Sequence, residues 1–528
     1  MAEGSQQRRT GGQPLFVLSE DSQRTAGRDA QQSNITAGKA VAESVRTTLG
    51  PRGMDKMLVS DSGDVVITND GATILQEMDI EHPAAQMIVE VAETQEDEVG
   101  DGTTTAAVLA GNLLSQAEDL IEREVHPTTI VEGYHEAARI AAETVDELVL
   151  DDAPGTERLR EVAQSSMTGK GTGGVTADSL AEVVVGAVEH VRTDDGVDRD
   201  AITVHTRTGA SSSDTELVEG ILVEEDGLHD AMPSSVSDAT VAVLDVEFGV
   251  ATGDVDAEYA VDSVDQLTRA MEAEESELRE YAETLSAAGV DVVFTTEDVD
   301  DRVASFMADT GILAFESLSD DDARSIATAT GASRVGTLDD LDSDDFGVTE
   351  QVRIETFGDD DVVFVEGGGA AETVTVFVRG GTGHVADELE RAVTDAIDVV
   401  ALAADSGEVV PGAGATEIAI SARLREAAAG VEGRRQLAVD AFADAVDVLP
   451  RTLAENAGAD PIDTLVDLRT RHDEAGRAGL IAVGQTGEVG DPVENGVFDP
   501  ADVKREAIES AAEAATMIAR IDDVISAE

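Results

Sequence analysis

The chain has 528 residues, with 111 acidic and 35 basic side chains and a formal net charge of −76 at pH 7. A protein this acidic is not expected to bind nucleic acid by neutralising phosphates, or to dock on an anionic membrane. Hydrophobic residues still make up 41% of the chain and the polar N-terminus lacks a secretion signal, so we predict a folded, cytoplasmic protein whose acidic surface suits concentrated salt.

Helices and one hairpin are predicted for the first 150 residues. We expect a helix over Ile35–Leu49 that ends at Gly50 and Pro51, because a glycine at the C-terminus and a following proline both stop a helix. Two strand-like runs follow, at Met57–Val59 and Val65–Ile67, around a short polar turn. Further helices are predicted over Ala84–Glu98, Thr104–Glu124 and Thr128–Val149.

The middle of the chain changes character after a polar break at residues 151–158. From Ile202 to about Gly380, short β-rich runs alternate with helices, which is an α/β pattern. One long helix, Val264–Ala287, follows an acidic stretch poor in core residues, so we expect it to project from the body. The chain then becomes helical again, over His384–Ala404, Gly414–Ala429, Gln436–Ala457 and Pro500–Ile521. This order indicates one discontinuous domain with insertions.

The most informative local motif is GDGTTT, Gly100–Thr105, which directly precedes an apolar helix. Glycines let the backbone approach an anion, and a helix N-terminus presents free amide donors to it. Asp101 is a candidate ligand for Mg²⁺, which prefers one or two carboxylates together with phosphate oxygens. The same residues also suit an ordinary helix cap, so both interpretations stay open at this point.

Three further loops would let the backbone approach a ligand closely, namely Thr48–Lys56, Ile67–Gly71 and Val409–Glu417. In the second of them, Asp70 is placed to orient a water or a metal. Each is equally compatible with a plain loop. The GxxxxGK[ST] phosphate-binding motif is absent, and GKGTGG over Gly169–Gly174 follows a helical stretch instead of a strand, so the dinucleotide context is missing. A nucleotide site in this chain would therefore be of another kind.

Lysine is scarce in this chain. Only four of the 35 basic residues are lysines, namely Lys39, Lys56, Lys170 and Lys504. A compact ammonium group is not interchangeable with a planar guanidinium where geometry is tight. The retained lysines are therefore candidates for a functional role, with chance retention as the alternative.

Taken together and in order, these segments resemble the group II chaperonins, the archaeal thermosome family, and specifically a salt-adapted member. The resemblance rests on TLGPRGMDKML, ITNDGATIL, VGDGTTTAAVLAGNLL, RGGTGHVADELERAVTDAI, VVPGAGATE, RTLAENAGADPID and VKREAIESAAEAATMIARIDDVI, which span nearly the whole chain. It implies an ATP-dependent molecular chaperone subunit of a double ring. The implied cofactors are ATP and Mg²⁺, and the implied partners are unfolded client proteins and related subunits.

The resemblance also implies a multidomain chaperonin fold. This fold has a mostly α-helical equatorial domain, an α/β intermediate domain and an α/β apical domain with a helical protrusion that forms a built-in lid. The implied boundaries are 1–154 and 408–528 for the equatorial domain, 155–224 and 376–407 for the intermediate domain, and 225–375 for the apical domain, with the protrusion at about 248–275.

Individual roles follow from the same resemblance. Asp395 is the implied catalytic carboxylate that activates the attacking water, Asp70 lies near the γ-phosphate and Lys170 senses it. Asp101 is the implied Mg²⁺ ligand. The implied nucleotide contacts are Leu49, Gly50 and Pro51, then Gly102, Thr103, Thr104 and Thr105 around the phosphates, Gly412 and Gly414 in a glycine loop, and Asp499 at the ribose or base.

The residues alone favour a plainer interpretation of Asp395, on the solvated face of an amphipathic helix with Arg391 four residues earlier as its ion-pair partner. The chain departs from the family at Ala413, where a third glycine is common, and we expect nucleotide binding to survive this change. Two alternatives remain: a ring paralogue that binds ATP with little turnover, and a soluble metabolic enzyme with an acidic surface.

Overall fold

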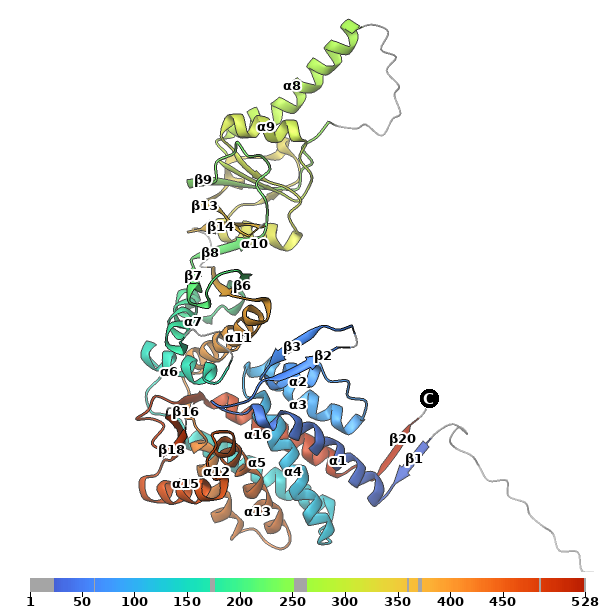
Figure 1. Cartoon of the computed structure of the whole chain (residues 1–528), viewed down its shortest axis with the longest axis vertical. Helices are drawn as coiled ribbons and strands as arrows, with labels where there is room; N and C mark the ends of the chain where they lie inside the picture. Colours follow the sequence, from blue (N-terminus) through green and yellow to red (C-terminus); the bar gives the residue numbers. More distant parts are fainter. Residues whose placement is uncertain are drawn as a thin grey trace, which may run out of the picture.

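The computed structural model describes residues 23–526, except 61, 171–175, 251–263, 359, 369–372 and 484–485. Its elements are arranged along one long axis in three parts, which we call the lower, middle and upper bodies after their places in Figure 1. Separate clusters of buried hydrophobic residues form the cores of these bodies. The chain passes upward through all three and then returns, so the lower and middle bodies each combine two chain segments.

The lower body is mostly helical. Its central helix, α4 (Thr103–Glu122), is rich in alanine and packs against α1 (Arg28–Val45), α3 (Pro83–Val99) and α16 (Ala501–Ala519). Small side chains allow this close packing, since a Cβ added at Gly111 would overlap the Cβ of Ala42. The other helices are α2 (Gly71–Gln76), α5 (Pro127–Leu148), α12 (Ala415–Ala428), α13 (Arg435–Val446), α14 (Val448–Asn456) and α15 (Pro461–Ala475).

Four two-stranded ribbons complete the lower body, all of them antiparallel. They are β1 (Gln23–Ala26) with β20 (Asp523–Ser526), β2 (Lys56–Val59) with β3 (Val65–Thr68), β16 (Val409–Pro411) with β19 (Phe498–Pro500), and β17 (Gly479–Val483) with β18 (Thr486–Gly490). The first of these ribbons joins the two ends of the described chain at the side of the lower body (Figure 1).

The middle body packs helices against a three-stranded sheet of order β6-β15-β7. Its helices are α6 (Thr156–Met167), α7 (Ala177–Val191) and α11 (Gly383–Ser406), and its strands are β4 (Arg192–Thr193), β5 (Gly196–Val197), β6 (Ile202–Thr208), β7 (Glu216–Val218) and β15 (Val374–Gly380). All seven residues of β15 are buried, as expected for a central strand covered on both faces.

The upper body is an α/β unit around a mixed sheet of order β11-β10-β9-β13-β14-β8, with β12 paired to β9. The strands are β8 (Gly220–Val223), β9 (Ser235–Leu244), β10 (Val292–Thr295), β11 (Leu313–Phe315), β12 (Arg334–Val335), β13 (Gly347–Phe357) and β14 (Asp360–Glu366). The helices are α8 (Val264–Ala288), α9 (Asp301–Thr310) and α10 (Asp320–Thr330). Figure 1 shows α8 projecting from the top of this body, as predicted for the long helix.

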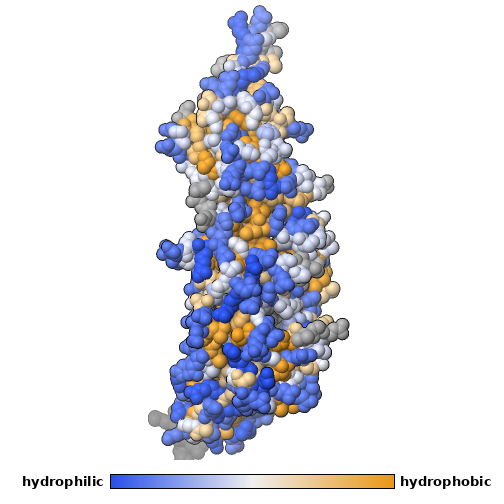
Figure 2. Space-filling view, turned by 90° about the vertical axis from the view of Figure 1, so that its left-hand side faces the viewer, coloured by the Kyte–Doolittle hydropathy of each residue, from blue (hydrophilic) through white to orange (hydrophobic). Residues whose placement is uncertain are grey.

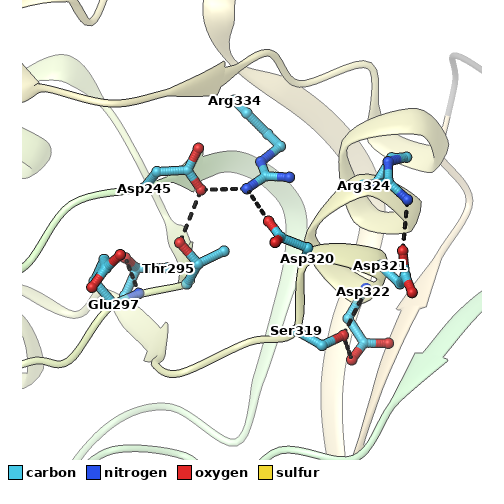
Figure 3. A network of polar contacts seen from close by, with 10 residues as sticks. Asp245, Thr295, Glu297, Ser319, Asp320, Asp321, Asp322, Arg324 and Arg334 are labelled. Carbon is cyan, nitrogen blue, oxygen red and sulfur yellow. Dashed lines mark hydrogen bonds and ion pairs between the residues drawn. The ribbon is translucent and has the colours of Figure 1, made fainter.

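An arginine ties the start of α10 to the sheet. Arg334 donates hydrogen bonds to Asp245 and to Asp320, each over 2.7 Å, so that one guanidinium bridges the end of β9 and the first turn of α10 (Figure 3). Two carboxylates on one guanidinium form a stronger set than a single exposed pair. This contact fixes the edge of the sheet at which the parallel strands end.

Most predicted helix boundaries agree with the structure within two residues. The first helix is an exception: α1 begins at Arg28 and ends at Val45, before a 3-10 turn over Arg46–Thr48. The buried positions in its early turns are occupied by Ala30 and Asn34. Because neither is a large apolar residue, the sequence shows no apolar periodicity there. The single helix predicted over Gln436–Ala457 is also wrong. It divides into α13 and α14, because Pro450 lacks an amide donor and fits only a first helical turn.

The described helices include none that is long and apolar enough to cross a membrane. Figure 2 shows one face of the molecule, on which hydrophilic residues predominate and hydrophobic residues form scattered groups. Part of the predicted protrusion, residues 251–263, lies outside the described residues.

Candidate functional site

A cavity of about 350 Å³ lies where the lower and middle bodies meet. Loops, helix ends and strands of the lower body form most of its wall, and the C-terminal end of α6 with the residues after it closes the other side. The predicted site residues that line it are Leu49, Gly50, Pro51, Asp70, Asp101, Gly102, Thr103, Thr104, Thr105, Lys170, Gly414 and Asp499. Segments far apart in the sequence are therefore brought to one cavity.

The GDGTTT segment forms the turn from α3 into α4. Gly102 has φ 83° and precedes the first residue of α4, so it occupies the left-handed region that favours glycine. A Cβ at this position would lie 2.9 Å from Nε2 of Gln95, a buried amide that donates to the carbonyl of Asp101 over 2.7 Å. The first-turn amides of α4 have no acceptor within the helix, so they are available to an anion in the cavity.

Asp70 stands beside this turn at the start of α2. One carboxylate oxygen caps α2 by accepting from the amide of Thr73 over 2.6 Å, and the other accepts from Oγ1 of Thr103 over 3.1 Å. Gly71 permits the close approach, because a Cβ there would lie 2.8 Å from the amide nitrogen of Thr104. The side chain is therefore held at a fixed point of the cavity wall.

The loop over Leu49–Pro51 is held from both bodies. Nδ2 of Asn456 donates to the carbonyl of Leu49 over 2.8 Å. On the other side, Gly169 of the middle body packs so closely that an added Cβ would lie 2.8 Å from Cα of Pro51. Asn69 donates to the carbonyl of Gly169 over 2.8 Å, which joins the two bodies at this point.

Asp395 on α11 is buried and forms an ion pair with Lys170. The interpretation that placed Asp395 on a solvated face beside Arg391 is therefore wrong: Arg391 pairs with Glu388, at 3.2 Å. The reason is that α11 packs against α6 and rests on the GDG turn, where a Cβ at Gly100 would lie 2.5 Å from Cβ of Asp398. A side chain that looked solvated in the sequence is thus buried against Lys170, which lines the cavity, whereas Asp395 itself is not a lining residue.

Several carboxylates share this region, and burial changes their protonation. Burial raises the pKa of Asp395 to about 7, with the charge of Asp70 adding to the rise and Lys170 opposing it. Burial also opposes the charged form of Lys170, but Asp395 and Asp101 raise its pKa above the ordinary value, so the ammonium persists. Glu96 of α3 was missed from the sequence; burial, then Asp395 and Asp70, raise its pKa to about 9.

Asp499 and the glycine loop form the other end of the cavity. Gly414 has φ 80° and Ala413 has φ 57°, so the alanine adopts a left-handed backbone conformation and is still accommodated. Glu417 of α12 was not predicted and Lys504 of α16 was singled out only as one of four retained lysines, and both line the cavity. Nζ of Lys504 lies 2.8 Å from Asp499 and 2.9 Å from Glu417. The scarcity of lysine was the only sequence signal for Lys504.

The remaining candidate positions do not line the cavity. Gly412 is not a lining residue, but a Cβ at this position would lie 3.1 Å from Oδ2 of Asp499. Lys56 begins β2 and does not line the cavity, and Lys39 pairs with Glu118 at 2.7 Å instead. Residues 171–174 of the GKGTGG segment lie outside the described residues.

Comparison with known proteins decides the family. The model of the TCP-1/cpn60 chaperonin family matches residues 41–528. The chain belongs to this chaperonin family. It is 66% identical to thermosome subunit 3 of Haloferax volcanii, over 98% of this chain and 99% of that protein. Thermosome subunit alpha of Halobacterium salinarum is 51% identical over 98% of this chain and 92% of that protein. The thermosome subunit of Methanopyrus kandleri is 49% identical over 98% of this chain and 95% of that protein.

These relatives confirm the predicted subfamily. The chain is a group II chaperonin subunit of the thermosome type, and salt-loving archaea are the source of two of these relatives, in keeping with the charge of −76. The fold agrees at the coarse level, since a helical body and bodies with mixed sheets share one chain. A metabolic enzyme of unrelated class is no longer a candidate.

The cavity of this chaperonin subunit fits a metal-bound nucleotide. In the described part of the chain, no three histidines or carboxylates stand close enough to hold a metal unaided. A cation in this cavity would therefore need further oxygen ligands, such as those of a bound phosphate. Asp101 beside free helix amides offers a carboxylate next to an anion-binding turn, which is the donor set that a Mg²⁺-bound phosphate requires.

Proposed function

We propose that this chain is an ATP-hydrolysing chaperone subunit of a double ring that works in the cytoplasm. It would bind unfolded proteins, enclose them under a built-in lid, and couple hydrolysis to folding. The observation that carries the proposal is the ion pair between Asp395 and Lys170 of the middle body, because Lys170 lines one cavity together with Asp70 and Asp101 of the lower body.

The residues divide the work along the cavity. The first turn of α4, with Gly102, Thr103, Thr104 and Thr105, would bind the phosphates through amides and hydroxyls, and the loop over Leu49–Pro51 would cover them. Asp101 would hold Mg²⁺, which neutralises phosphate charge when bound. Gly412, Gly414 and Asp499 would contact the nucleoside.

Asp395 would act as the general base for the attacking water. Its pKa of about 7 suits this task, because a base with a pKa near the working pH is ionised often enough and still accepts a proton readily. Asp70, fixed by Thr73 and Thr103, would orient the same water from the opposite wall. The ammonium of Lys170 would hold the Asp395 carboxylate and interact with the terminal phosphate.

This division places the catalytic base and the phosphate cradle on different bodies. Hydrolysis then requires the middle body to rest on the lower body, as the contact between Gly169 and the loop at Gly50 and Pro51 illustrates. Chemistry is thereby coupled to domain position. In this proposal the lower, middle and upper bodies are the equatorial, intermediate and apical domains, with boundaries near 154, 224, 375 and 407, and α8 belongs to the lid.

The test is Asp395→Ala, assayed for ATP binding and hydrolysis in high salt. We expect binding to be retained and turnover to fall by roughly 10²-fold or more, because the general base is lost. Asp387→Ala is the matched control, since this exposed aspartate lies on the same helix. Normal hydrolysis by the Asp395 variant would overturn the assignment, and a wild-type ring that binds ATP without turnover would favour the structural paralogue.

A further inference from the structure

The nucleoside end of the cavity contains a buried ammonium group that the proposed hydrolysis does not use. Nζ of Lys504 lies 2.8 Å from Oδ2 of Asp499 and 2.9 Å from Oε1 of Glu417. The side chains of Lys504 and Glu417 are 13% and 7% exposed, whereas that of Asp499 is 26% exposed. Of these three groups, Asp499 is therefore the one that a ligand in the cavity reaches most easily.

We propose that Lys504 is a positioning residue that holds Asp499 for the sugar hydroxyls, and thereby makes the site prefer ribonucleotides to 2′-deoxyribonucleotides. This inference rests on the proposed nucleotide binding. A carboxylate accepts hydrogen bonds and cannot donate, so it selects hydroxyl donors, and the neighbouring 2′ and 3′ hydroxyls of ribose supply two. Each carboxylate oxygen can accept more than one bond, so Oδ2 can serve Lys504 and a hydroxyl together.

Lys504 is needed because the backbone alone does not fix the carboxylate. Asp499 pairs in register with Val410 in the ribbon of β16 and β19, which places its Cα. On one side Gly412 limits the side chain, because a Cβ at Gly412 would lie 3.1 Å from Oδ2. The ammonium of Lys504 holds the same oxygen, so the carboxylate is kept in one orientation before a ligand arrives.

Glu417 is a second acceptor for the ammonium of Lys504. Burial lowers the pKa of Lys504, but Asp499 and Glu417 raise it further, so the pKa lies above the ordinary value and the ammonium persists. Because Glu417 shares the ammonium, Lys504 does not take up all the acceptor capacity of Asp499. Oε1 of Glu417 lies 2.9 Å from Nζ of Lys504 and its side chain is only 7% exposed, so Glu417 anchors Lys504 from within the wall.

Lys39 provides a matched comparison within the same body. Its Nζ lies 2.7 Å from Glu118 and links α1 to α4, but neither residue lines the cavity. A lysine that only ties two helices together should affect stability without changing which nucleotide binds. Position in the cavity wall is what separates Lys504 from Lys39.

The experiment measures kcat and KM for ATP and for 2′-deoxyATP on assembled rings in constant high salt. The variants are Lys504→Met and the control Lys39→Met. We expect wild type and the control to prefer ATP, and Lys504→Met to raise KM for ATP by roughly 10-fold or more through loss of charged hydrogen bonding, while kcat changes little. Because KM for 2′-deoxyATP should rise less, the preference for ATP should collapse.

Three outcomes bear on the inference separately. A Lys504→Met ring that keeps the wild-type preference overturns it, as does a wild type that does not discriminate between the two nucleotides. A wild type that neither binds nor hydrolyses ATP overturns the proposed function instead. If Lys504→Met does not assemble, Glu417→Gln serves in its place: a reduced preference for ATP supports the inference, and an unchanged one refutes it.

Discussion

Glu96 offers a sharp test of how the cavity handles charge. Its carboxyl group is buried on α3, one oxygen has no hydrogen-bond partner, and its pKa is raised from 4.5 to about 9, first by burial and then by Asp395 and Asp70. The folded protein therefore keeps the proton at neutral pH, while the unfolded chain releases it. Stability must fall as pH rises from the unfolded pKa toward the folded one.

The perturbation is Glu96→Gln, which keeps the shape and removes the titration. Each pH unit between the two pKa values costs the folded state about 1.4 kcal/mol. At pH 7 the variant should thus be more stable than wild type by on the order of 3 kcal/mol, and near pH 4.5 the difference should approach zero. Glu98→Gln is the control, because Glu98 is exposed on the same helix.

The assay is chemical unfolding of the nucleotide-free protein in constant high salt with a chelator, followed by circular dichroism across the range from about pH 5 to pH 8. We expect the difference between Glu96→Gln and wild type to widen with pH, and the Glu98→Gln curve to follow wild type. If the Glu96→Gln and wild-type curves run parallel, Glu96 does not hold a proton in the folded state and the electrostatic account of the cavity is wrong.

Three further results are expected. Because Asp395 has a pKa of about 7 in the nucleotide-free protein, kcat/KM should fall about tenfold per unit as pH drops below that value, and a flat pH profile would contradict its role as the base. Gly102→Ala forces a Cβ against Gln95 at φ 83°, so ATP affinity should fall roughly 10-fold in a binding titration, and unchanged affinity would show that the turn is not the phosphate cradle. Asp447 is buried against Arg425 and Arg469; Asp447→Asn should destabilise the lower body by about 3–5 kcal/mol in the same unfolding assay, and wild-type stability would show that the ion pairs contribute little.

Local chemistry made much of the site predictable. The turns at Gly50, Gly102 and Gly414 require positive φ or close approach. A single glycine at each turn meets this requirement, so the turns can be recognised from the sequence. Helix lengths followed from apolar periodicity except where small or polar residues took core positions, as Ala30 and Asn34 do in α1. The chaperonin resemblance, carried by several motifs in order, supplied the roles that single motifs left open.

Contacts between distant segments could not be predicted in the same way. Asp395 looked solvated because its helix shows a polar face, and only the packing of α11 over the GDG turn buries it against Lys170. Glu96 looked like one more acid in an acidic chain, since its protonation depends on Asp70 and Asp395. In a chain with 111 acidic residues, nothing in the sequence distinguishes the one glutamate that is protonated from the many that are ionised on the surface.

The path of the chain gives each joint between bodies two crossings. The upper joint is crossed once between β7 and β8 and again between β14 and β15, and Phe357, Phe364 and Phe377 pack together there. One connection would leave the upper body free to rotate about the long axis, whereas two connections resist that rotation and leave bending as the easier motion. The upper body should therefore tilt in a preferred plane, and a protease that cuts one crossing should leave it attached but free to rotate.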